Sequence, residues 1–134
     1  MSATDAFFDS NVILYLPGTD LQKAARSSEL LRVGGVVSVQ VLNEVVRVTR
    51  SKYKFDWARV ELLLATVRQA CRIEPLTLYT HDLALTLAHR HHVHIFDANI
   101  IAAASLAGCH TLWSEDMQDG QVIGGLTIRN PYKS

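Results

Sequence analysis

Short, predominantly apolar runs recur along the chain and are separated by longer stretches of mixed character. These runs lie at residues 6–9, 36–39, 71–75, 110–114 and 126–128. Runs of this length without a polar face are typical of strands buried in a parallel sheet. We therefore predict four to five strands, the first over residues 6–9 and the last, a short one, over 126–128.

The stretches between these runs carry apolar residues at helical spacing. They predict helices over residues 10–16, 20–33, 40–50, 57–70, 83–92 and 95–104. Asp20, Ser38 and Asp56 stand where N-caps belong, and Thr80 or Asp82 would cap the helix at 83–92. The stretch from residue 95 is apolar almost all round, so we expect it to form the most buried helix.

Strands that alternate with helices indicate a parallel sheet with helices on both faces, joined by right-handed crossovers. We predict a single domain over residues 1–134, an α/β fold in which a mostly parallel sheet of four to five strands is the middle layer of a three-layer α/β/α sandwich. In such sheets the ligand site lies outside the carboxyl ends of the strands. Polar residues at those ends are therefore the first candidates for a functional site.

Four acidic residues from separate segments are predicted to meet at this edge. Asp9 ends the first strand, and Asp116 follows the fourth. Glu44 lies at the margin of the apolar face of its helix, and Asp97 lies in the first turn of the helix that begins at residue 95. Asp119, in the same loop as Asp116, is a further candidate ligand, although loop acids are commonly just solvated.

Clustered carboxylates repel one another unless a cation binds or some of them take up protons. Hard divalent cations prefer oxygen ligands, and a bound ion can activate water and neutralise developing phosphate charge. We therefore interpret the acids as a divalent-metal site for phosphodiester hydrolysis. Ser10, Asn11 and Ser114 are candidates for hydrogen bonds that orient the acids, with ordinary strand-end and cap chemistry as the alternative.

Composition limits the other possibilities. The 13 basic and 13 acidic residues cancel, so contact with a polyanion must use a local patch. Candidates for contacts with RNA phosphates are Arg47, Arg50, Lys52 and Lys54, although a solvated basic turn is an equal explanation. The two cysteines, Cys71 and Cys109, are not in a metal-binding spacing and indicate reduced thiols in a cytoplasmic protein. We expect no signal peptide and no membrane span.

The motifs that carry the acids resemble those of a known family. They are residues 8–11 (FDSN), 38–44 (SVQVLNE), 96–104 (FDANIIAAA) and 112–117 (LWSEDM). Over residues 5–131 the chain resembles PIN-domain ribonucleases, and among them the VapC-type toxins of type II toxin–antitoxin pairs. The resemblance implies an α/β/α sandwich, Mg²⁺ or Mn²⁺ dependence, endoribonuclease activity, a homodimer and inhibition by a cognate antitoxin. By position, Asp9, Glu44, Asp97 and Asp116 match the family's acidic quartet.

Other interpretations remain open at this point. A non-catalytic RNA- or antitoxin-binding module on a degenerate nuclease fold is the main alternative, and phosphotransfer is disfavoured because no lysine ends a strand. Residues 89–94 are rich in histidine. We interpret them first as a structural helix end and second as a patch that touches RNA or a partner. A zinc site is the least favoured interpretation, because zinc ligands should share one face.

Overall fold

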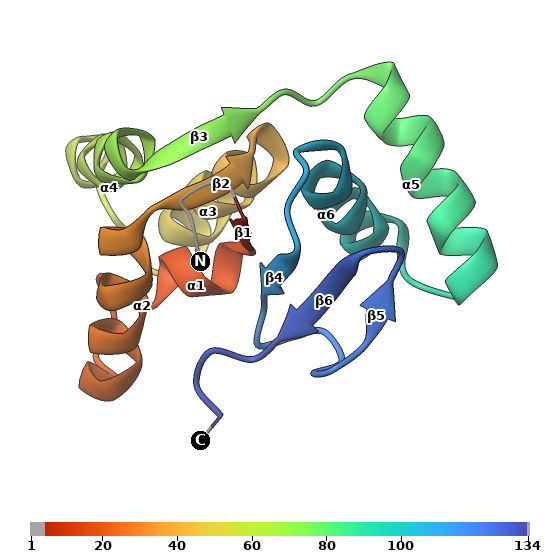
Figure 1. Cartoon of the computed structure of the whole chain (residues 1–134). Coiled ribbons are helices and arrows are strands. Elements are labelled where there is room, and N and C mark those ends of the chain that lie inside the picture. Colours follow the sequence, from red (N-terminus) through yellow and green to blue (C-terminus); the bar gives the residue numbers. More distant parts are fainter. Residues whose placement is uncertain (1–4, 134) are drawn as a thin grey trace.

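The computed structural model describes residues 5–133, so residues 1–4 and 134 of the predicted domain lie outside the described part. Within it, one sheet has the strand order β3-β2-β1-β4-β6-β5 (Figure 1). The strands are β1 (Ala6–Phe8), β2 (Gly35–Ser38), β3 (Cys71–Glu74), β4 (Thr111–Trp113), β5 (Val122–Ile123) and β6 (Leu126–Arg129). All neighbouring strands are parallel except β5 and β6, which are antiparallel.

The apolar run near the N-terminus forms the centre of the sheet. Phe7 of β1 pairs with Val36 of β2 on one side and with Leu112 of β4 on the other, and all three side chains are fully buried. A strand enclosed in this way must be apolar on both faces, which is why the sequence shows a continuous apolar run there. The chain leaves this strand at Asp9, so the first acid stands at the middle of one sheet edge.

Helices cover both faces of this sheet. They are α1 (Ser10–Leu14), α2 (Leu21–Val33), α3 (Val39–Ser51), α4 (Trp57–Ala70), α5 (Leu78–His91) and α6 (Ile95–Leu106). Figure 1 shows α2 and α4 on one side and α5 packed along α6 on the other, as the contacts between these helices require. The predicted three-layer α/β/α sandwich with a mostly parallel sheet is therefore confirmed.

Most predicted helix starts are also confirmed, because their caps are local. The side chains of Asp20, Ser38 and Asp56 each accept a hydrogen bond from the backbone N–H three residues later. The helix predicted to be the most buried is α6, in which every residue from 98 to 104 is buried. Its four alanines in this stretch are small enough to let the helix backbone approach the sheet closely.

Two predictions about elements were wrong. Helix α5 begins at Leu78 rather than near residue 83, because Thr77 is its N-cap and forms a reciprocal capping box with Thr80. Strand β5 was not predicted, and it raises the number of strands to six within the described residues. It is only two residues long and turns at Gly124, which has φ +61°, to pair with β6. A strand this short forms only because it pairs with β6, and two residues are too few to show a hydrophobic pattern in the sequence.

Cys71 and Cys109 are both buried, and burial raises the pKa of each thiol to about 11. Both side chains belong to the main hydrophobic core. Among residues 5–133, none of the helices combines the length and the apolar character that crossing a bilayer would require.

The contact between β2 and β1 gives a test of the packing. A Cβ added at Gly35 would lie 2.7 Å from the carbonyl oxygen of Ala6 and 2.8 Å from Cε2 of Phe8. We expect Gly35→Ala to lower the free energy of unfolding by about 2 kcal/mol, because neither the backbone nor the buried ring can move away freely. Urea denaturation measures the loss, with Gly125→Ala as the control, since a Cβ there meets no atom within 4 Å. Equal stability of the two variants would contradict this packing.

Candidate active site

Asp9 is the most buried of the predicted acids, with 5% of its surface exposed. It caps α1, and its Oδ1 accepts a hydrogen bond from the backbone N–H of Ser10 at 2.7 Å. Its Oδ2 accepts hydrogen bonds from the Ser114 hydroxyl at 2.8 Å and from the Asn11 amide at 3.3 Å. Its own N–H continues the sheet by donating to the carbonyl of Trp113. This carboxylate is therefore fixed in place by β1, α1 and the end of β4.

Glu44 reaches the same edge from α3. Its Oε2 accepts a hydrogen bond from the Ser10 hydroxyl at 2.7 Å. Ser10 directly follows Asp9, so Glu44 is bound to the residue next to that acid. Gln40, one turn earlier on α3, donates to Glu44 Oε1 at 3.4 Å and to the carbonyl oxygen of Phe96 at 3.0 Å. The Gln40 amide thus links α3 to the first turn of α6, where Asp97 lies.

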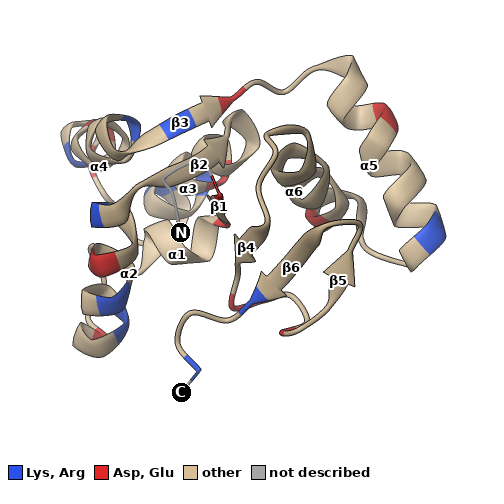
Figure 2. Cartoon of the chain, in the orientation of Figure 1, with Lys and Arg blue, Asp and Glu red and all other residues tan. Residues whose placement is uncertain are grey.

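Asp116 comes to the site on the loop after β4. Asn11 donates to Asp116 Oδ2 at 3.2 Å, and the same amide nitrogen approaches Asp9. The Ser114 hydroxyl, which donates to Asp9, accepts hydrogen bonds from the backbone N–H groups of Asp116 and Met117 at 3.3 and 3.4 Å. The three predicted orienting residues, Ser10, Asn11 and Ser114, therefore lie between the acids and contact them. Figure 2 shows acidic positions in red on α3, on α6 and in the loop after β4.

The acids influence one another electrostatically. Burial raises the pKa of Asp9 to about 6; hydrogen bonds from Ser114 and Ser10 oppose this rise, and the charges of Glu44 and Asp97 add to it. Burial also raises the pKa of Asp97, with Asp116 adding to the rise and His94 opposing it. Among residues 5–133, none of the four acids forms an ion pair with a basic side chain. The site is thus a concentration of carboxyl groups that, within the described residues, are not paired with basic side chains.

The donors fit a hard divalent cation, since all of them are carboxylate oxygens. Within residues 5–133, however, no three His, Cys, Asp or Glu side chains are arranged as a ready-made metal cage. Serine and asparagine side chains contact Asp9, Glu44 and Asp116 and fix the positions of these carboxylates. Mg²⁺ commonly keeps several waters and uses one or two carboxylates directly, so it does not require such a cage.

Other predicted residues lie apart from the acids. The Asp119 carboxylate accepts a hydrogen bond from the N–H of Asn130 at 2.8 Å and pairs with Lys133 at 3.7 Å, so it faces the C-terminal segment rather than the other acids. The Arg50 guanidinium stacks 4.4 Å from the centre of the Trp57 ring and donates to the carbonyl of Phe55. It therefore stabilises the turn between α3 and α4. Lys54 occupies that turn with φ +59°.

Two hollows flank Asp116, which lines both. One has a volume of about 430 Å³, and Arg47, Lys52 and Tyr53 are among its lining residues. The other has a volume of about 290 Å³ and contains Asp97 together with three of the clustered histidines, His91, His92 and His94. The predicted structural role at a helix end is also seen, because His94 caps α6 and His92 ends α5 in the left-handed conformation.

Sequence reasoning missed several polar residues beside the acids. Gln40 left a weak signal, because it stands four residues before Glu44 on the same helical face. Tyr15, Lys23 and Glu115 form a hydrogen-bonded group next to Asp116, whereas the sequence suggested an outward-facing Glu115 and a packing role for Tyr15. Glu115 is 100 positions from Tyr15 and 92 from Lys23 along the chain, and only the folded chain brings such residues together.

Comparisons with known proteins agree with this architecture. A family model described as PIN domain matches residues 6–118. The chain therefore belongs to the PIN domain family. A comparison with curated protein sequences finds no significant match.

Solved structures with the same fold include three of bacterial origin. A toxin–antitoxin complex from Klebsiella pneumoniae has 22% identity and a TM-score of 0.71, over 96% of this chain and 99% of that chain. The sarcin–ricin loop cleaving toxin VapC20 of Mycobacterium tuberculosis has 18% identity and a TM-score of 0.64, covering 83% and 89%. VapBC2 of Rickettsia felis bound to promoter DNA has 20% identity and a TM-score of 0.64, covering 93% and 97%. At these identities the likeness shows a shared fold.

The raised pKa of Asp9 predicts a pH-dependent stability difference. Since the pKa of Asp9 is about 6 in the fold and 3.8 is its ordinary value, the folded protein retains a proton that the unfolded chain releases between these pH values. Stability therefore falls as pH rises through this window. The test compares the free energy of unfolding of the wild type with that of Asp9→Asn, both in EDTA. We expect the wild-type value minus the variant value to fall by about 2 kcal/mol between pH 4 and pH 8. Urea denaturation of both proteins measures it, and a pH-independent difference would contradict the buried, raised-pKa carboxyl.

Proposed function

We propose that this chain is a metal-dependent endoribonuclease and the toxin of a type II toxin–antitoxin pair. The observation that carries the proposal is the meeting of four acids at one sheet edge. The side chains of Ser10, Asn11 and Ser114 contact Asp9, Glu44 and Asp116. Asp97 shares a hollow with Asp116, and its charge adds to the rise in the pKa of Asp9 that burial causes. Membership of the PIN domain family and a fold shared with proteins described as toxins support it.

In this proposal Asp9, Asp97 and Asp116 are the principal ligands of Mg²⁺ or Mn²⁺, with Glu44 as a further ligand or as the residue that orients water. The bound ion would supply an activated water and neutralise charge on the phosphate. The chain's own contribution is to hold the carboxylates. Ser114 and the N–H of Ser10 fix both oxygens of Asp9, and the Ser10 hydroxyl fixes Glu44.

The two hollows beside Asp116 suggest how RNA lies across the site. A strand whose scissile phosphate sits at the acids would extend into both hollows, one walled by Arg47, Lys52 and Tyr53 and the other by histidines. Arg47 and Lys52 are exposed and would contact phosphates on one side of the cleaved bond. Of the four basic candidates, these two are supported by their positions, whereas Arg50 is engaged with Trp57.

A non-catalytic module that binds RNA or antitoxin is the second candidate. It is favoured by one observation, the lack of a ready-made metal cage among residues 5–133. Cleavage of RNA with Mg²⁺ that stops on addition of EDTA would separate the two functions, since a binding module would show no cleavage under either condition.

Substitution of single acids tests the nuclease directly. We expect Asp9→Asn and Asp97→Asn to reduce Mg²⁺-dependent RNA cleavage by at least about a hundredfold, the upper range for losing a group that orients or holds the metal. The fold should remain, as circular dichroism would show. Asp119→Asn is the matched control and should retain activity, because the Asp119 carboxylate faces Asn130 and Lys133. Undiminished activity in both Asp9→Asn and Asp97→Asn would contradict the assignment.

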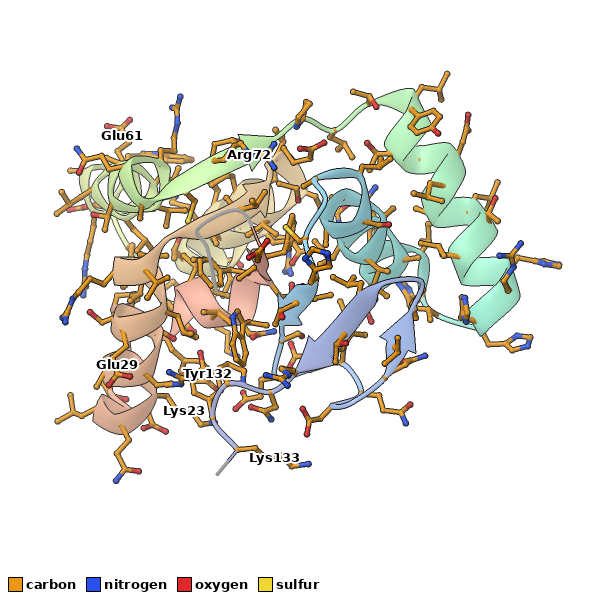
Figure 3. All side chains as sticks on the ribbon, viewed as in Figure 1. Lys23, Glu29, Glu61, Arg72, Tyr132 and Lys133 are labelled. Atoms are coloured by element: carbon orange, nitrogen blue, oxygen red, sulfur yellow. The ribbon has the colours of Figure 1, made fainter. Side chains whose placement is uncertain are left out.

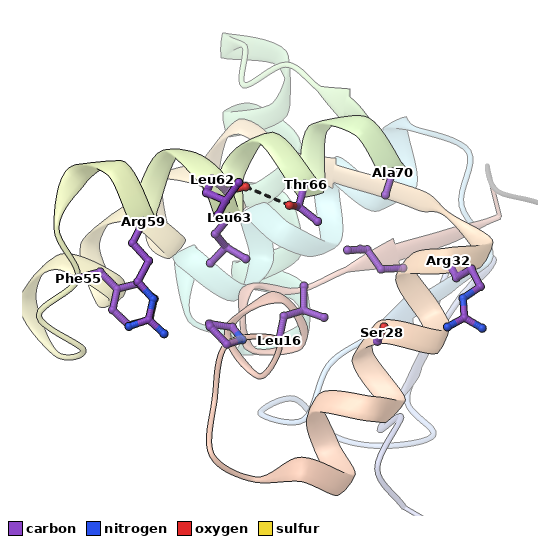
Figure 4. A pocket seen from close by; sticks show the side chains of 11 residues that line it. Leu16, Ser28, Arg32, Phe55, Arg59, Leu62, Leu63, Thr66 and Ala70 are labelled. Atoms are coloured by element: carbon purple, nitrogen blue, oxygen red, sulfur yellow. Dashed lines mark hydrogen bonds between the residues drawn. The ribbon is translucent and has the colours of Figure 1, made fainter.

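An apolar groove offers a surface for the antitoxin. It has a volume of about 470 Å³ and lies between α4, α2 and the turn after α1, with Leu16, Leu31, Leu62 and Leu63 among its lining residues (Figure 4). Arg32 and Arg59 also line it. An antitoxin helix with an apolar face and flanking acidic residues would match this combination.

A different face supports the proposed homodimer. Large apolar side chains are exposed at the start of α5 and at the start of α6: Leu76, Leu78, Tyr79 and Phe96 are between 44% and 75% exposed. Leu76 and Phe96 line one hollow, and exposed apolar side chains that lie together commonly mark a protein interface. A second copy of the chain would bury them.

The two faces can be tested separately with matched leucine-to-lysine substitutions. Leu62→Lys should prevent capture of a co-expressed cognate antitoxin and leave the homodimer intact. Leu78→Lys should prevent formation of the homodimer and leave antitoxin capture intact. The reason is that Leu62 lines the groove, whereas Leu78, 75% exposed, lies on the other face. Size-exclusion chromatography with light scattering measures both complexes. If neither substitution changed either complex, both assignments of these faces would be wrong.

A further inference from the structure

Glu115, the residue before Asp116, is held by contacts at both its carboxylate and its backbone. Its Oε1 accepts a hydrogen bond from the Tyr15 hydroxyl, and its Oε2 pairs with Nζ of Lys23. Lys23 also donates to the Tyr15 hydroxyl at 3.1 Å, which closes a three-membered group. The backbone N–H of Glu115 donates to Oδ1 of Asn11 at 3.1 Å, and the other end of that amide donates to Asp116.

Helix α2 and the C-terminal segment hold Lys23 in place. Its ammonium group lies 4.7 Å from the ring centre of Tyr15 and 5.4 Å from that of Tyr132. Figure 3 shows Lys23 on α2 beside Tyr132 of the segment after β6. The Tyr132 hydroxyl is 2.6 Å from that of Ser27, and Arg26 donates to the carbonyl of Pro131. The Lys23 side chain, which is partly exposed, is therefore contacted by the end of α1, the loop after β4 and the C-terminal segment.

This group also removes a surplus charge from the site. Glu115 and Asp116 line the same hollow, so an unpaired Glu115 would add a fifth negative charge beside the four acids. Although partial burial acts against ionisation, hydrogen bonds from Lys23 and Tyr15 leave the pKa of Glu115 below its ordinary value. The same contacts raise the pKa of Lys23. Both carboxylate oxygens of Glu115 are engaged by Tyr15 and Lys23, so the pairing turns this side chain away from Asp116 and from the other acids.

We propose that Lys23 and Tyr15 are positioning residues that act through Glu115 to hold the loop of residues 114–117 and to aim the Asp116 carboxylate at the metal. The inference rests on the proposed function for the identity of the metal site, but the ordering of the loop does not. Partners that orient a metal ligand typically change metal affinity or activity by about 10- to 100-fold when removed. Lys23 and Tyr15 stand one residue further away, so the lower figure applies.

The test compares Lys23→Met and Tyr15→Phe with the wild type, using Mn²⁺ as the probe. Electron paramagnetic resonance measures Mn²⁺ affinity, and we expect both variants to bind about tenfold more weakly. Cleavage kinetics should show a loss in kcat with little change in KM for RNA. Amide exchange measured by mass spectrometry should become faster over residues 113–119. Arg68→Met, which removes an exposed cation from the last turn of α4, is the matched control and should change none of these values.

Two further variants separate positioning from simple destabilisation. Lys23→Arg keeps the charge and should retain Mn²⁺ affinity within about threefold. Adding Glu115→Gln to Lys23→Met should recover part of the lost affinity, because the neutral amide removes the unpaired charge and still accepts from Tyr15. A purely structural role predicts no such recovery.

The proposal is overturned if Lys23→Met and Tyr15→Phe bind Mn²⁺ within twofold of the wild type with unchanged exchange over residues 113–119. A wild-type protein that binds Mn²⁺ but cleaves no RNA would instead contradict the proposed function, while the affinity and exchange comparisons would still decide the role of Lys23. If the wild type bound no Mn²⁺, exchange over the loop alone would decide it: unchanged exchange in both variants would refute the positioning role.

Discussion

The burial of the Asp9 carboxylate beside three other acids is the constraint on which this site depends. Asp9 lies in the centre of the sheet edge with 5% of its surface exposed, and among the described residues no basic side chain forms an ion pair with it. Hydrogen bonds from the Ser114 hydroxyl and the Ser10 N–H offset only part of the effect of burial, which raises the pKa of Asp9 to about 6. A fold that retains such a charge at the expense of stability is typical of a site organised for a ligand. A divalent cation is the ligand that would neutralise the charges of these acids.

The topology of the sheet explains how acids from four segments reach one place. Strand β1 is central, so its end at Asp9 adjoins the ends of both β2 and β4. Helix α3 follows β2 directly and carries Glu44 in its second turn, and the loop after β4 carries Asp116. Helix α6 delivers Asp97 from its first turn, which Gln40 ties to α3 through the carbonyl of Phe96. Each acid is therefore placed by an element that the core already fixes.

The parts of this arrangement that are local in sequence could be predicted. N-caps such as Asp20 and Asp56, the buried helix at α6 and the acids at strand ends follow from neighbouring residues and from the rule for parallel sheets. The parts that depend on distant contacts could not. Asp119 has the same local setting as Asp116, and only the position of Asn130 and Lys133 turns it away. Likewise Lys23 is an ordinary helix lysine until the fold brings Glu115 to it.

The central claim is that Asp9, Glu44, Asp97 and Asp116 together bind a divalent cation. Anomalous diffraction from crystals of the whole chain grown with Mn²⁺ tests it most directly, because manganese is located independently of any assumption about activity. The account predicts a manganese peak within coordination distance of carboxylate oxygens of Asp9 and of at least one other of the four acids. Saturating Mn²⁺ that left this sheet edge without a peak, or placed the ion elsewhere on the chain, would contradict it.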